Sequence, residues 1–142
     1  MRRAFRLALF TAAALLAALA IPAIAQQTVK REPIKAISDV SGAATFAAYC
    51  SVCHGPAGAG NGPAATALVK APADLTRIAQ RNGGKFSAGA VRMSITGDTV
   101  IAAHGTRDMP MWGPLFRSVE SDSTAQLRVR NLVDYLEALQ VK

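Results

Sequence analysis

The sequence of 142 residues is poor in cysteine, with only Cys50 and Cys53. A small exported protein that depends on disulfides needs several cysteines spread along its chain. These two stand three positions apart, so a bridge between them would close almost no loop and add little stability. This scarcity excludes a disulfide-rich fold and predicts another role for the pair.

Acidic residues are also scarce, with 9 against 16 basic ones. The basic residues are spread thinly and are not interleaved with aromatic ones, which argues against a nucleic-acid-binding surface. A mild positive charge favours docking to an acidic protein partner, although ordinary solubility charge accounts for it equally well. No stretch alternates apolar and polar residues as a half-buried strand does.

Long apolar runs are absent after residue 25. Residues 1–25 read as an export signal, because three early arginines precede an apolar stretch from Leu7 to Ile21 and an Ala23-Ile24-Ala25 cleavage site. Cleavage before Gln26 would leave 13 basic and 9 acidic residues, a net charge of about +4, in a periplasmic protein. The alternative is a retained membrane anchor, since Leu7 to Ala25 carries no charge.

The rest of the chain has room for one small domain, residues 41–142, after a leader at 26–40. A first helix is predicted from Ser41, with Ser41 or Asp39 as its cap. A short capped helix follows from Asp74 to Gln80, and another from Ser87 to about Thr96, where Gly97 ends the second. Residues 97–118 are predicted to be irregular.

The clearest predicted helix is the last one, which a capping box from Ser123 to Gln126 would begin. Apolar side chains recur along it at helical spacing and form one stripe. They are Ala125, Val129, Leu132, Val133, Leu136 and Leu139. The charged residues Arg128, Arg130, Asp134 and Glu137 are expected on the opposite, solvent-facing side.

Chemistry concentrates in Cys50-Ser51-Val52-Cys53-His54, because C-x-x-C-H is the attachment signature of c-type haem. Thiols at i and i+3 lie about one helical turn apart, which suits addition to two haem vinyl groups. The following imidazole can ligate the iron. A thioredoxin-like pair would need β-α-β patterning, and zinc would need four suitably spaced ligands, so both are disfavoured.

A second axial ligand has four candidates, Met93, His104, Met109 and Met111. Met109 is favoured because Pro110 restricts the backbone beside it and helps to hold a thioether in place. Met93 lies on a predicted helix, where methionine is more often core filler. Met111 and His104 remain alternatives, as does an open iron site.

The stretch after the motif is rich in glycine and proline between Gly55 and Gly62, which excludes regular structure there. A loop wrapped closely around a bulky flat group explains these glycines better than a linker does. Over residues 42–140 the chain resembles a class I c-type cytochrome. The residues that carry the resemblance are Gly42, Phe46, the Cys50–His54 motif, Gly62-Pro63, Met109-Pro110 and Tyr135.

The resemblance implies an all-α cytochrome c fold in which the first and last helices cross around a covalently bound haem. It implies that Gly42 makes room for the crossing and that Phe46 packs near Tyr135. It further implies that the Pro63 carbonyl accepts the Nδ1 proton of His54.

The sequence therefore predicts a periplasmic one-electron carrier rather than an enzyme. It would hold one haem c through Cys50 and Cys53, with His54 and Met109 on the iron, and exchange electrons with redox protein partners. One alternative is a cytochrome subunit fixed in a periplasmic dehydrogenase or oxidase complex. Others are a haem protein with an open iron site and a thiol-disulfide enzyme.

Overall fold

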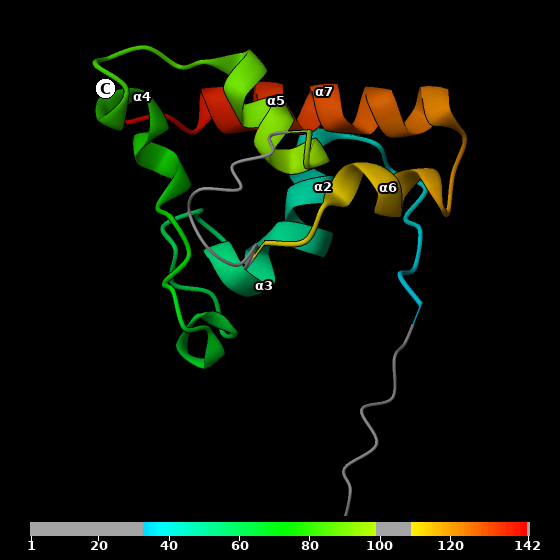
Figure 1. The fold of residues 1–142 in the computed structure, drawn as a ribbon, viewed down its shortest axis with the longest axis horizontal. Coiled ribbons are helices and arrows are strands. Elements are labelled where there is room, and N and C mark those ends of the chain that lie inside the picture. Colours follow the sequence, from blue (N-terminus) through cyan, green and yellow to red (C-terminus); the bar gives the residue numbers. More distant parts are fainter. Residues whose placement is uncertain (1–32, 99–108, 142) are drawn as a thin grey trace, which may run out of the picture. The chain divides into compact units, whose positions relative to one another are not determined.

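The structure is a computed structural model that describes residues 33–98 and 109–141 (Figure 1). Regular structure in these ranges is entirely helical, which confirms the all-α prediction. The elements are α2 (Gly42–Thr45), η1 (Phe46–Cys50), α3 (Ser51–His54), η2 (Ala65–Ala67), η3 (Leu75–Arg77), α4 (Ile78–Arg81), α5 (Ala88–Thr96), α6 (Trp112–Arg117) and α7 (Asp122–Ala138). No helix in the described ranges is long and apolar enough to cross a membrane.

The first helical segment begins as predicted. The Ser41 hydroxyl accepts a hydrogen bond from the Ala44 amide (3.2 Å), and the Asp39 carboxylate accepts one from the Ser41 amide (2.8 Å). Both predicted residues therefore take part: Ser41 caps the helix, and Asp39 binds the backbone amide of Ser41. The helix then continues without a break through η1 into α3.

Helix α7 packs against α2, α5 and α6 (Figure 1). A Cβ added to Gly42 would collide with the Asn131 carbonyl oxygen and the Tyr135 side chain, so the two helices approach as closely as their backbones allow. The Phe46 and Tyr135 rings lie 5.5 Å apart between centroids. The predicted roles of Gly42, Phe46 and Tyr135 are confirmed.

The apolar stripe of α7 faces the core as predicted, with Ala125, Val129, Leu132, Val133 and Leu136 all buried. The core also contains Phe46, Cys50, Val91, Ile95 and Phe116. Helix α5 ends at Gly97, whose φ of 83° lies in the left-handed region that favours glycine. The core is therefore made where these helical segments pack against one another.

Three local predictions were wrong. The cap of α7 is Ser121, whose hydroxyl accepts from the Thr124 amide (3.2 Å), rather than Ser123. Residues 112–117 form helix α6, although two of the six residues are glycine and proline. Packing of its Trp112 and Phe116 rings against Tyr49 of η1 (5.4 and 5.3 Å between centroids) outweighs local propensity. Arg128 is buried, because Glu120 neutralises its charge inside the fold.

Candidate functional site

The two cysteines and the histidine of the motif lie on one short helical segment. Its turn at η1 is widened to a π-helix, in which the Ser51 amide donates to the Phe46 carbonyl five residues earlier. Single π turns occur often at functional sites because they displace side chains from the normal helical register. Cys50 is buried at the end of this turn, Cys53 is half-buried, and both are free thiols.

Burial dominates the electrostatics of the first thiol. It raises the pKa of Cys50 to about 12, with a smaller contribution from the neighbouring Cys53. A thiol with this pKa stays protonated at neutral pH, whereas thiol-disulfide exchange needs a thiolate.

The glycine-rich loop satisfies the last carbonyls of α3. The Gly60 amide donates to the His54 carbonyl (2.8 Å), and the Gly62 amide donates to the Cys53 carbonyl (3.0 Å). A Cβ on Gly62 would collide with the Val52 carbonyl, so only glycine permits this approach. The loop therefore holds the helix end that carries the motif, which is a reason for its glycines that the sequence did not reveal.

The His54 side chain is oriented by a backbone carbonyl. Its Nδ1 lies 2.9 Å from the carbonyl oxygen of Ala73. A carbonyl can only accept, so Nδ1 carries the proton and donates, which leaves the lone pair of Nε2 available to a metal. The prediction that the Pro63 carbonyl accepts this proton was wrong. The residues around Pro63 contact the backbone of α3 instead, where the Ala64 amide donates to the Val52 carbonyl (2.9 Å).

The acceptor Ala73 precedes a well-fixed turn. The Asp74 carboxylate accepts from the amide (2.9 Å) and the hydroxyl (2.6 Å) of Thr76, and the Asp74 carbonyl accepts from the Arg81 guanidinium (2.7 Å). The hydroxyl bond from Thr76 is the main reason why the pKa of Asp74 is lowered. Sequence patterns could reveal the cap at Asp74, but a backbone carbonyl such as that of Ala73 carries no residue-type signal.

The candidate second ligands are separated by the structure. Met109 is exposed and directly precedes Pro110 and the start of α6. Met111 packs over Gly97, where an added Cβ would lie 2.6 Å from its Cγ and 3.0 Å from its Sδ. Met93 is exposed on α5 rather than buried as filler, and His104 lies outside the described residues. No hydrogen bond or ring contact in the described ranges joins Met109 to His54, so its ligation stays a prediction.

The chemistry-bearing residues do not form a conventional metal centre by themselves. In residues 33–98 and 109–141 there is no group of three or more histidine, cysteine or acidic side chains that could hold a metal ion. The site instead offers two thiols and one imidazole with a free Nε2.

Residues 37–126 match a family model described as cytochrome C oxidase, cbb3-type, subunit III. The match covers more than half of the chain, from the segment before α2 into α7, and includes the motif and Met109. The chain belongs to this family. Comparisons with curated proteins and with solved structures gave no match.

Membership of a monohaem c-type cytochrome family confirms the resemblance seen in the sequence and supports a haem c electron-transfer protein. The side chains of this cytochrome c domain fit such a group. Cys50 and Cys53 are free and one helical turn apart, and His54 presents an unprotonated nitrogen. Two thiols at this spacing can add to the two haem vinyl groups, and a neutral imidazole nitrogen can ligate the iron.

Proposed function

We propose that the protein is a periplasmic one-electron carrier whose single haem c is attached through Cys50 and Cys53 and ligated by His54 and Met109. The observation that carries the proposal is the His54 ring, whose Nδ1 is held by the Ala73 carbonyl at 2.9 Å on the same helical segment as two free thiols. That arrangement supports one fixed axial ligand beside two covalent anchors.

Each residue has a distinct part in this function. Haem, when bound, supplies a one-electron ferric–ferrous couple. Cys50 and Cys53 would hold it to the chain, and the hydrogen bond to Ala73 fixes the tautomer of His54 so that its Nε2 can ligate the iron. Met109 would contribute a soft sulfur that favours the ferrous state, with Pro110 limiting backbone movement beside it.

The other reading of the cysteines, thiol-disulfide exchange, is disfavoured by their surroundings. The raised pKa of the buried Cys50 thiol, about 12, keeps it in the unreactive protonated form. Resistance of both cysteines to alkylation in the purified protein, with haem retained by the denatured chain, would separate the two readings.

Absorption spectra of the purified protein in both redox states test attachment and ligation together. We expect low-spin c-type bands in the wild type and retention of haem on a denaturing gel. Met109→Ala should create an open site that binds carbon monoxide rapidly, whereas the matched Met93→Ala, at an exposed position of α5, should not. Rapid carbon monoxide binding by the wild type at neutral pH would contradict ligation by Met109.

Export is tested on the same preparation. The intact mass should correspond to a chain that begins at Gln26. In cell fractionation, this chain should appear with the periplasmic contents. A chain that keeps residues 1–25 and fractionates with membranes would show that the segment is an anchor instead.

A second candidate function is a cytochrome subunit fixed in an oxidase complex, and the description of the matching family favours it. Native electrophoresis of gently solubilised cells, stained for covalent haem, distinguishes the two. A free carrier migrates near its own mass of 14.8 kDa or less. A fixed subunit migrates with a larger band that also reduces oxygen.

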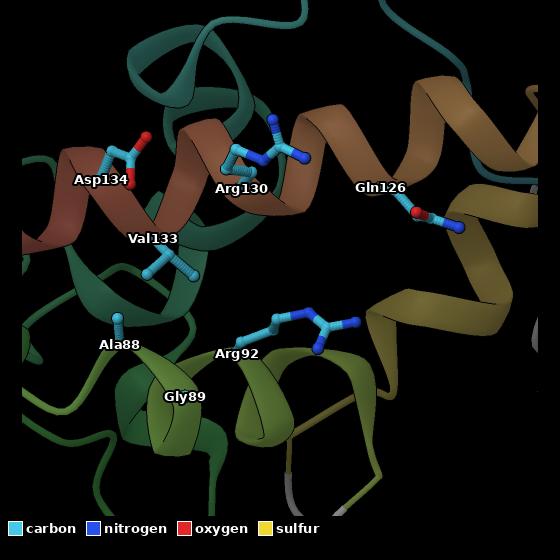
Figure 2. Close-up of a pocket in the computed structure, with 7 residues that line it drawn as sticks. All are labelled: Ala88, Gly89, Arg92, Gln126, Arg130, Val133 and Asp134. Atoms are coloured by element: carbon cyan, nitrogen blue, oxygen red, sulfur yellow. The ribbon is translucent and has the colours of Figure 1, made fainter.

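We further propose that an acidic segment of the redox partner docks in a groove of about 290 Å³ between α5 and α7 (Figure 2). The groove is lined by Ala88, Gly89, Arg92, Gln126, Arg130, Val133 and Asp134. No residue of the motif-bearing helix α3 lines it.

Charge supports this choice of partner. Arg92 and Arg130 come from the two facing helices, are exposed, and have no ion pair or side-chain hydrogen bond with any described residue. Figure 2 shows Arg92 reaching from α5 along the gap toward the Gln126 end of α7. Asp134 is the one acidic side chain in the lining, so the groove carries one net positive charge. Guanidinium groups bind carboxylates in a bidentate manner.

Binding of a fluorescent peptide of alternating glutamate and leucine to the holoprotein tests the groove. Arg92→Gln with Arg130→Gln should weaken binding at least tenfold, and salt should weaken it in the wild type. The matched control is Arg117→Gln, because Arg117 is exposed on α6 and does not line the groove. Equal loss in the control, no loss in the double variant, or a preference for anionic vesicles or inorganic phosphate would contradict this site.

A further inference from the structure

The C-terminal end of the chain is tied to the turn that follows Ala73. The Gln140 side chain donates from Nε2 to the Leu75 carbonyl (2.8 Å) and accepts at Oε1 from the Ala79 amide (2.9 Å). Beside it, the Val141 amide donates to the Thr76 carbonyl (2.9 Å). Three hydrogen bonds therefore join the turn at residues 75–79 to residues 140–141.

Gln140 has little freedom to do anything else. Its Nε2 also donates to the Leu136 carbonyl of α7 (2.7 Å), so both amide protons and the amide oxygen are engaged. All of its partners are backbone groups, which keep their places when neighbouring side chains change. The carboxamide is thus a rigid connection between α7 and the turn.

The turn at residues 75–79 also restrains Ala73, whose carbonyl accepts the Nδ1 proton of His54. Leu75, which Gln140 binds, is two residues from Ala73, and its amide donates to the Gly58 carbonyl (2.7 Å). Asp74, between them, caps the helical turn that follows, and its carboxylate accepts a hydrogen bond from the Thr76 amide. Ala73 is therefore followed by a turn in which Leu75 is bonded both to the glycine-rich loop, at Gly58, and to Gln140.

From these contacts we infer that Gln140 is a positioning residue for His54, acting through the carbonyl of Ala73; this inference rests on His54 being the haem ligand proposed above. A fixed acceptor keeps the Nδ1–H hydrogen bond short, which increases electron donation from Nε2 and would stabilise ferric iron. A loosened turn weakens that bond. The reduction potential then rises, because the ferric state loses more stabilisation than the ferrous state.

The test compares Gln140→Ala with Gln80→Ala in the holoprotein. Gln80 is a matched control, since it lies on the neighbouring helix α4, is exposed, and makes no side-chain hydrogen bond to any described residue. Gln140→Ala removes the side-chain bonds to Leu75, Ala79 and Leu136. In this variant we expect the His54 Nδ1 proton, followed by NMR, to exchange roughly tenfold faster, because its acceptor is held less firmly. The reduction potential should rise in Gln140→Ala and stay unchanged in Gln80→Ala.

A milder variant guards against unfolding. Thr76→Val removes the hydroxyl bond to Asp74 and keeps the shape of the side chain, so it should move both readouts in the same direction by less. A lower melting temperature in Gln140→Ala with unchanged proton exchange and potential would make Gln140 merely structural and overturn the inference. So would equal shifts in Gln80→Ala. Absence of haem bands from the wild type is a separate result, which refutes the proposed function itself.

Discussion

At the residue scale, Arg128 shows how a charged side chain can be part of the core. It is 1% exposed, and its guanidinium donates twice to the Glu120 carboxylate (2.9 and 2.8 Å). The remaining donors reach the Thr45 hydroxyl (3.2 Å) and the carbonyls of Asp39 and Ile37 (2.8 Å each). All five N–H groups are thus satisfied, and the bond to Glu120 raises the pKa of Arg128 above its ordinary value.

Arg128→Met should destabilise the protein by about 3–5 kcal/mol, because it leaves the Glu120 carboxylate without its partner in a nearly buried place. Arg130→Met is the matched control on the same helix and should stay within about 0.5 kcal/mol, since Arg130 is exposed. The free energy of unfolding of both variants is measured in denaturant. Similar values for the two would show that the buried cluster contributes little.

Gly42→Ala should destabilise the protein by about 1–3 kcal/mol, because the new Cβ would collide with the backbone of Asn131 and the side chain of Tyr135. Gly89→Ala, in helix α5, is the control, because a Cβ there meets nothing within 4 Å. That change should be neutral or stabilise by up to about 1 kcal/mol through better helix propensity. Thermal denaturation of the two variants measures the contrast, and equal stability would show that α2 and α7 can separate without cost.

At the element scale, α7 has an inward side wide enough to include a charged residue. Arg128 precedes Leu132 by four positions, so helical spacing places it on the inward side with Leu132 and the neighbouring Val129. The motif helix α3 is different, because four residues are too few for a stable helix in isolation. It depends on the preceding π turn and on the loop amides that satisfy its last carbonyls.

Ser121→Ala should cost about 0.5–2 kcal/mol, because it removes the acceptor for the Thr124 amide. Ser123→Ala should cost less than about 0.5 kcal/mol, since Ser123 is exposed and bonds only the Ser121 hydroxyl through its side chain. Urea unfolding followed by far-ultraviolet circular dichroism measures both. A larger effect at Ser123 would return the start of α7 to the position that the sequence predicted.

At the scale of the whole molecule, the fold is small and every described helix except α7 is short, so a bound group with a large apolar surface would supply much of its stability. The double variant Cys50→Ala, Cys53→Ala should therefore lose the cooperative thermal transition. Val52→Ala is the control within the motif, because Val52 is half exposed and neither thiol is changed. A cooperative, native-like melt of the double variant, followed by circular dichroism, would disprove this dependence.

Much of the architecture could be predicted because it depends on residue type and spacing within short stretches of the chain. The apolar stripe of α7, the Asp74 cap and the Gly97 stop each follow from residue type and spacing. Arg128 was predicted to face solvent because helical periodicity assigns charged residues to the outward side. That rule takes no account of the Glu120 carboxylate, eight residues earlier, which pairs with Arg128 in the fold. Helix α6 was missed because its aromatic contacts come from η1, far away in the sequence.

The candidate site divides in the same way. By itself the sequence determined the C-x-x-C-H spacing of two thiols and an imidazole, from which haem attachment is predicted, since this spacing depends only on neighbouring residues along the chain. Only the tertiary structure decided which carbonyl holds His54, because Ala73 lies 19 residues away and is identified by position rather than by side chain. It also decided that Arg128 is buried and that Gln140 reaches the turn after Ala73. Backbone acceptors and buried ion pairs depend on how distant segments pack, and no local pattern encodes that.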